Sequence, residues 1–156
     1  MAAATPLPET MTAIQVVAYN APYELTSVPV PSALGPHDIL VKVAVASYCH
    51  TDSLFHAGAL PLPLPITASH EGAGTVVAVG AAVANFTIGD RAMGETETML
   101  EHIAEHGIKL ESNVFHGLDK IYEALELVNS GKISGKAVIV VDEEQVKNDE
   151  KIGAKY

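Results

Sequence analysis

The chain has 156 residues, which is enough for one domain with a substantial hydrophobic core. Hydrophobic residues make up 48% and charged residues 18%, which is a globular composition and not a disordered one. The formal net charge is −10, and Arg91 is the single arginine. This balance excludes a basic surface for phosphate groups, so nucleic-acid binding is not expected.

Cysteine usage and the apolar stretches indicate the compartment. The chain has one cysteine, Cys49, so no internal disulfide can form, which fits a reducing compartment. No basic segment followed by an apolar one opens the chain, so no secretory signal is visible. Prolines or charges interrupt the most apolar stretches, so no membrane span is expected. A cytoplasmic protein is the expectation.

The first part of the chain predicts short strands. Residues 1–11 are rich in Ala, Thr and Pro and predict a flexible arm. Alternation of apolar and polar residues then predicts strands over 12–19, 23–30, 39–48 and 74–83. The near-continuous apolar run over 39–48 favours a strand buried on both faces. A short helix is predicted over 49–58, and prolines at every second position exclude helix from the segment that follows.

The sequence pattern changes after Gly94 from one typical of strands to one that also predicts helices. Thr98 and Glu101 have capping-box spacing and predict a helix that ends at Gly107. The pattern then predicts a strand over 108–115, a helix closed by Gly131 and a final strand over 136–141. Residues from 142 onward are charged, lack a clear period and predict a tail. Early strands with late helices indicate an α+β, mainly β domain, not a run of βαβ units.

The residues that bear chemistry concentrate between positions 49 and 71. They are Cys49, His50, Asp52, His56, His70 and Glu71. Thiolate and imidazole are good zinc ligands, and a catalytic zinc takes three protein ligands and leaves one position open. Cys49 and His70 follow separate structured stretches, so the fold could bring them together. From the residues alone, the more common explanation of such a pattern is a small buried cysteine and a histidine that only serves a turn.

The segment "YCHTDSLFHAGALPLPLPITASHEGAG" resembles the zinc-containing alcohol dehydrogenases of the medium-chain dehydrogenase/reductase superfamily, especially the yeast-type branch. "CHTD" matches the family's first zinc-ligand segment. "HEGAGTVVAVGAAV" matches the G-H-E-x-x-G-x5-G signature except that Ser69 replaces its first glycine. "VGAAVANFTIGDR" and the stretch from "EHIAEHG" to "GKAVIVV" follow in the family's order. The resemblance covers about residues 12–142.

The resemblance implies a GroES-like catalytic domain, a partly open β-barrel with C-terminal helices. In the family, a Rossmann coenzyme domain, a structural zinc lobe and the third catalytic zinc ligand lie before the last segment. Here "GDRAMG" runs almost directly into "ETETMLEHIAEHG", so the resemblance implies a deletion with a junction near 92–97. The expected organisation is an arm over 1–11, the catalytic domain over 12–142 and a charged tail over 143–156.

The resemblance also implies roles for the site residues. Cys49 and His70 correspond to catalytic zinc ligands, and Glu71 is the adjacent acid that can approach the metal. Thr51 corresponds to the proton-relay hydroxyl, and His50 lies near coenzyme and substrate. Asp52 corresponds to a partner that orients a ligand. Because the third ligand is missing, a bound zinc would need Glu71, Asp52, His56 or a partner chain to complete its shell.

Three functions are compatible with this sequence. The first is a non-redox enzyme, of isomerase, cyclase or lyase type, that acts on a small carbonyl metabolite through Cys49, His70 and Glu71, with or without zinc. The second is a non-catalytic binding module. The third is a dehydrogenase subunit that needs a coenzyme domain in trans. No NAD(P) site is expected in the chain itself, and an uncovered apolar wall predicts a homodimer.

Overall fold

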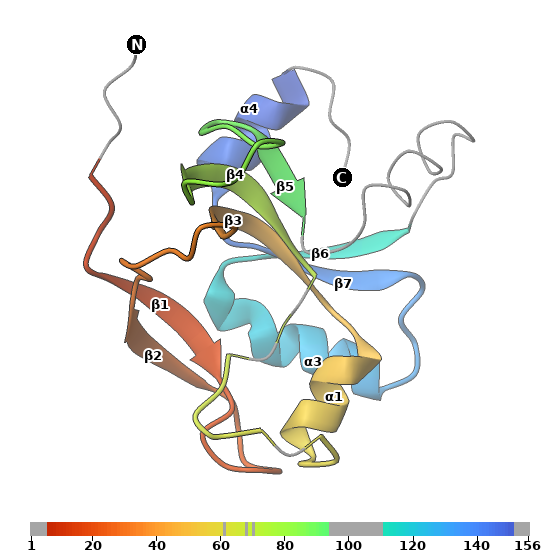
Figure 1. Ribbon diagram of the computed structural model, residues 1–156. Helices are drawn as coiled ribbons and strands as arrows, with labels where there is room; N and C mark the ends of the chain where they lie inside the picture. The colour runs from red at the N-terminus through yellow and green to blue at the C-terminus, as the bar shows by residue number, and fades with distance from the viewer. Residues whose placement is uncertain (1–5, 61, 68, 70, 94–110, 152–156) are drawn as a thin grey trace.

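The computed structural model describes residues 6–60, 62–67, 69, 71–93 and 111–151 (Figure 1). Its elements are β1 (Thr10–Gln15), β2 (Glu24–Pro29), β3 (Ile39–Tyr48), α1 (His50–His56), β4 (Gly72–Val79), β5 (Arg91–Met93), β6 (Ser112–His116), the 3-10 turn η1 (Leu118–Lys120), α3 (Ile121–Asn129), β7 (Lys136–Val140) and α4 (Glu143–Lys151). The predicted strand over 39–48 and the short helix after it are confirmed. The helix predicted over 98–107 and most of the junction near 92–97 lie outside the described residues.

The strands form two sheets. β1 and β2 make an antiparallel hairpin, and the larger sheet has the order β5-β4-β3-β7-β6. β6 and β7 are parallel and are connected through η1 and α3, whereas the other pairs of this sheet are antiparallel. The described residues therefore contain a single βαβ unit and no closed barrel. This confirms the predicted mixed fold, which is mainly β and has its helices late in the chain.

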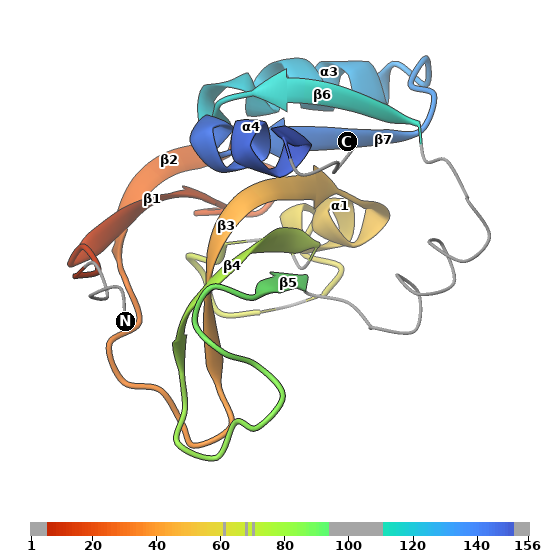
Figure 2. The same ribbon diagram turned by 90° about the horizontal axis from the view of Figure 1, so that it is seen from above.

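Helices cover the two faces of the larger sheet (Figures 1 and 2). In Figure 1, α1 and α3 lie below the sheet and α4 lies above it. Figure 2, seen from above, shows α4 in front of β7 and α3 behind β6. The core between these layers is small and aliphatic. Its most buried members are Val16, Ala44, Val76, Ala124 and Ala137, each no more than 3% exposed.

The expectation that β3 is buried on both faces is wrong. Within β3 only Ala44 is buried, and Val43 is 38% exposed. An apolar run reports hydrophobicity, but burial depends on which elements lie over each face. α4 reaches β3 near Ala44, whose carbonyl accepts the backbone N–H groups of Val141 and Asp142 at 2.7 and 3.0 Å. The strand is therefore only partly covered.

The segment expected to be a charged tail contains α4. Asp142 precedes this helix, and its carboxylate accepts the backbone N–H of Gln145 at 3.0 Å. Val146 is 7% exposed and is the helix's buried apolar residue. One apolar residue in a charged segment produces no visible period, which is why the pattern did not predict the helix. None of the described helices is long and apolar enough to cross a membrane.

The glycines of the "EGAG" segment serve close packing of strands. β4 begins at Gly72, and the pairing of β3 with β4 shifts register between Val43 and Val45. A Cβ atom added at Gly74 would lie 1.9 Å from the carbonyl oxygen of Lys42. A side chain is therefore excluded at Gly74, where the two backbones approach each other.

Candidate functional site

Cys49 occupies the junction between β3 and α1. It is the N-cap residue of α1 and is half-buried. Asp52, three residues later, turns back so that its Oδ2 atom accepts the backbone N–H of Cys49 at 2.7 Å. Only 2% of Asp52 is exposed. This arrangement fixes the backbone that carries the thiol, because the carboxylate satisfies an N–H group that precedes the helix.

A cavity of about 190 Å³ opens beside Cys49. It is lined by Tyr48, Cys49, His50, Ser53, Val128, Ile133, Gly135, Lys136 and Ala137. The first four residues come from the end of β3 and the start of α1. The others come from the end of α3 and the start of β7, far away in the sequence. The cavity therefore combines a thiol, an imidazole, a hydroxyl and an ammonium group with apolar side chains.

Glu71 connects the starts of β4 and β7 to the end of β3. Its Oε2 atom accepts hydrogen bonds from the Ser47 hydroxyl and the Lys136 ammonium group. The Glu71 side chain is 14% exposed, whereas that of Lys136 is 53% exposed and lines the cavity. The fold thus pairs Glu71 with a lysine that lines the Cys49 cavity and that the sequence analysis did not identify.

His56 has a structural position at the other end of α1. Its ring stacks on Tyr23 with centroids 4.9 Å apart and an interplanar angle of 19°. Its Nε2 atom lies 2.6 Å from the carbonyl oxygen of Ala21. These contacts hold the ring against the start of β2, so His56 does not complete a metal shell with Cys49 in this structure. Thr51 is half-buried in the first turn of α1, and His50 is exposed.

The central prediction of the sequence analysis, that Cys49 and His70 are close in space, is not tested because His70 lies outside the described residues. Within the part of the chain that the structure describes, no group of three His, Cys, Asp or Glu side chains could hold a metal ion. Cys49 and Glu71 are chemically suitable donors, but Glu71 is engaged with Lys136 and Ser47. The described donors therefore do not form a complete zinc site by themselves.

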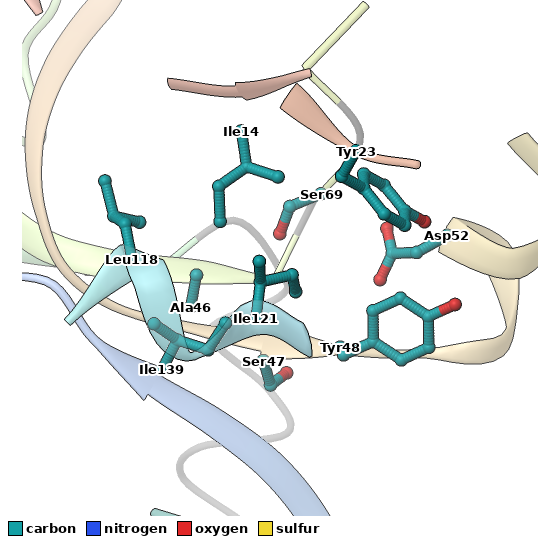
Figure 3. Close-up of a pocket in the computed structure, with 10 residues that line it drawn as sticks. All are labelled: Ile14, Tyr23, Ala46, Ser47, Tyr48, Asp52, Ser69, Leu118, Ile121 and Ile139. Atoms are coloured by element: carbon teal, nitrogen blue, oxygen red, sulfur yellow. The ribbon is translucent and has the colours of Figure 1, made fainter. Parts of the chain in front are cut away.

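A smaller cavity, of about 60 Å³, lies between α1, β1, β3 and α3 (Figure 3). We call it the inner cavity, and its lining residues are Ile14, Tyr23, Ala46, Ser47, Tyr48, Asp52, Ser69, Leu118, Ile121 and Ile139. Tyr23 is 6% exposed, and burial raises the pKa of its hydroxyl, with Tyr48 and Asp52 adding to this effect. The Tyr48 hydroxyl is 2.9 Å from the hydroxyl oxygen of Ser53.

Sequence reasoning missed Tyr23, Tyr48 and Lys136. Tyr23 lies just before β2 and Tyr48 ends β3, where single tyrosines carry no pattern. Lys136 begins a strand that is far from Cys49 in the sequence. Only the pairing of β3 with β7, which places Tyr48 opposite Ala137, brings Lys136 beside the cysteine.

Comparisons with known proteins show the family of the domain. Residues 35–145 match the model of the alcohol dehydrogenase GroES-like domain. Alcohol dehydrogenase 1 of Emericella nidulans is 45% identical over 75 residues, which cover 47% of this chain and 21% of that protein. L-threonine 3-dehydrogenase of Edwardsiella ictaluri is 40% identical over 82 residues, which cover 50% of this chain and 24% of that protein.

A solved structure gives the same result. Benzyl alcohol dehydrogenase from Acinetobacter calcoaceticus superposes with a TM-score of 0.50 and 31% identity, covering 54% of this chain and 23% of that one. The chain spans about a quarter or less of the length of these three proteins. The likeness therefore concerns the GroES-like part of each.

Proposed function

Because the chain belongs to the family of alcohol dehydrogenase GroES-like domains, we propose that it binds a small carbonyl or alcohol compound beside Cys49. We propose further that it acts on this compound without transferring a hydride by itself, as an isomerase, cyclase or lyase. The observation that carries the proposal is the cavity of about 190 Å³ at Cys49. Its mixture of apolar walls and a few polar groups is typical of small-molecule sites.

The residues that the family resemblance identifies have proposed roles. Without zinc, His70 or His50 takes a proton from the carbon next to the carbonyl group and returns it at another position, so that no electrons are gained or lost. When His70 binds zinc, His50 takes this role. Thr51 donates a hydroxyl hydrogen bond to the substrate oxygen. Glu71 and Asp52 orient these groups, and Asp52 does so through the backbone of Cys49.

Zinc is the metal that the family implies, and we propose Cys49, His70 and Glu71 as its ligands. When bound, it would polarise the substrate's carbonyl oxygen. The Lys136–Glu71 ion pair is then the contact that zinc would have to displace. Elemental analysis of the purified protein, before and after chelation, measures zinc directly, and C49S is expected to reduce the zinc content.

A second candidate function is that of a dehydrogenase subunit whose coenzyme domain comes from another chain. It is supported by the relatives, which are alcohol and threonine dehydrogenases. Hydride transfer needs a bound nicotinamide, which the protein must position. This candidate predicts that a Rossmann-type protein co-purifies with the chain and that the mixture, unlike the chain alone, reduces NAD(P)⁺ with an alcohol.

The decisive experiment is a turnover assay of the purified chain on a panel of small aldehydes, ketones and hydroxyketones, followed by NMR, with added zinc and with chelator. The active protein should lose turnover in H70A and C49S but keep it in H37A, a matched control for an exposed histidine. If wild type turns over no compound, and H70A binds the panel as wild type does, the enzyme proposal fails. A non-catalytic binding module would then remain.

We also propose that the chain is a cytoplasmic homodimer. Exposed large apolar side chains support self-association, among them Val43, Val114 and Tyr122. Light scattering at several concentrations should give twice the chain mass, and a monomer at all concentrations would contradict the proposal. The single cysteine suits a reducing compartment. Fractionation of the source cells should recover the protein in the cytosol.

A further inference from the structure

The inner cavity is separate from the Cys49 cavity, although Tyr48 lines both. Its two ends differ in chemistry. In Figure 3, Tyr23, Tyr48 and Asp52 gather at the α1 side, whereas Ile14, Leu118 and Ile139 surround the opposite side. The cavity is therefore amphipathic, with hydroxyl and carboxylate oxygens at one end and aliphatic carbon at the other.

The polar end contains a buried hydroxyl group, that of Tyr23, which makes no hydrogen bond of normal geometry and has the Tyr48 hydroxyl as a neighbour. Tyr23 is more than nine-tenths buried, and its oxygen has no hydrogen-bond partner among the described residues. Leaving a buried hydroxyl unpaired costs free energy, so such groups in native proteins are usually satisfied by water or a ligand. Burial is the main cause of the raised pKa of Tyr23, and the neighbouring Tyr48 hydroxyl adds to the effect.

The volume limits what can enter. An engineered protein cavity of about 150 Å³ binds benzene, which has six heavy atoms, so a heavy atom needs roughly 25 Å³. The inner cavity of about 60 Å³ therefore holds two or three heavy atoms. Two waters fit, but they would leave the aliphatic end poorly filled. A two-carbon molecule with a hydroxyl group would match both ends.

We propose that the inner cavity is a second binding site, for a two-carbon alcohol whose hydroxyl group hydrogen-bonds to Tyr23 at the polar end and whose carbon atoms contact Ile14 and Ile121. Ser69, which is exposed, marks the opening of this site. The site does not depend on the proposed reaction at Cys49, because its ligand does not touch the thiol.

The test is a methyl NMR titration of the whole chain with ethanol. Binding should shift the methyl signals of Ile14 and Ile121, which line only the inner cavity, and leave those of Val128 and Ile133 unchanged. The latter two line only the Cys49 cavity, so the two sites are read separately. A three-heavy-atom ligand binds with a Kd of about 1 mM at best, so the titration must reach tens of millimolar.

Two variants and one larger alcohol complete the test. A46V fills the cavity from β3 with a residue that favours strands and should abolish the saturable shifts. Y23F keeps the ring that stacks on His56 and should weaken binding by about two- to tenfold. Y19F, an exposed tyrosine, is the matched control and should bind as wild type does. tert-Butanol, with five heavy atoms, should not bind.

The proposal is overturned if ethanol gives only linear, non-saturating shifts, since the cavity then holds water alone. It is also overturned if A46V or Y23F binds ethanol as tightly as wild type, or if tert-butanol shifts the same methyl groups. Saturable shifts confined to Val128 and Ile133 would contradict this site and support the Cys49 cavity instead.

Discussion

An aspartate accepts a backbone N–H near the start of both α1 and α4: Asp52 lies in the first turn of α1, and Asp142 directly precedes α4. The two aspartates differ in burial. Asp52 is 2% exposed and lines the inner cavity together with Tyr23 and Tyr48. The Asp142 side chain is 17% exposed and pairs with Lys42 at 2.5 Å, whose side chain is 63% exposed. Both carboxylates therefore satisfy a backbone N–H at a helix start, but that of Asp52 supports a candidate site and that of Asp142 only anchors the chain at α4.

The comparison shows that surroundings, and not residue type, separate a functional position from a structural one. Asp142 has a solvated partner, so its loss can be compensated by water. Asp52 holds the backbone of Cys49 where little water can replace it. Mutations at the two positions should therefore differ in size and in what they affect.

The largest expected effect is that of D52A. It leaves the buried N–H of Cys49 without its acceptor, which costs about 1–3 kcal/mol of unfolding free energy. D52N keeps an acceptor oxygen for the Cys49 N–H and should lose less unfolding free energy than D52A. Urea denaturation measures both variants. If D52A costs no more than D142A, burial does not distinguish the two aspartates and the comparison breaks down.

D142A should cost about 1 kcal/mol, the usual value for a lost N-cap. The reason is that the N–H of Gln145 can turn to water when the carboxylate is absent. The same denaturation experiment measures this, and the Cys49 cavity should keep any ligand affinity it has. A loss of affinity in D142A would show that α4 supports the site after all.

The Lys42–Asp142 pair should appear in the pH dependence of stability. The hydrogen bond from Lys42, and then that from Gln145, lowers the pKa of Asp142. A carboxyl group with a lowered folded-state pKa stabilises the fold above its unfolded value of about 3.9, and this contribution disappears as pH falls through the folded-state pKa.

The measurement is the difference in unfolding free energy between K42A and wild type. It should be constant from pH 7 to about pH 5, at roughly 0.2–1 kcal/mol because the pair is exposed, and should shrink below about pH 4. High salt should reduce it as well. A difference that does not change with pH would show that the ion pair contributes nothing.

The smallest expected effect is that of Y23F at neutral pH, within about 0.5 kcal/mol of wild type, because the lost hydroxyl has no bond to break. At alkaline pH the unfolding free energies of Y23F and wild type should diverge. Burial raises the pKa of Tyr23, so the folded state favours the neutral phenol and its contribution is lost as pH rises above about 10. Y23F should therefore be less destabilised than wild type at pH 11. Equal losses of unfolding free energy by wild type and Y23F at pH 11 would contradict the burial of this hydroxyl.

Much of the fold could be predicted from local patterns. The apolar run over 39–48 predicted β3. Apolar residues at helical spacing predicted α3, and Gly131, with a φ of 68°, marks its end. α4 escaped prediction because a single buried valine produces no period. The burial of β3 escaped as well, since it depends on what covers each face.

Some residues of the candidate site could be predicted from the sequence and others could not. Cys49, Asp52 and Glu71 could be identified as chemically suitable residues, and motif order predicted the family. That His70 and Cys49 lie close together in space stays a prediction. Tyr23 and Lys136 could not be found, because isolated tyrosines and lysines look alike wherever they occur.

The sequence alone determined most of the described elements, with α4 as the exception, since periodicity and turn residues act over a few neighbours. It also determined the family to which the domain belongs. Only the tertiary structure decided that Lys136 faces Glu71 and that a tyrosine before β2 shares a cavity with an aspartate of α1. Such contacts join residues that are distant along the chain, and they depend on strand pairing and on how the layers pack, which no local pattern encodes.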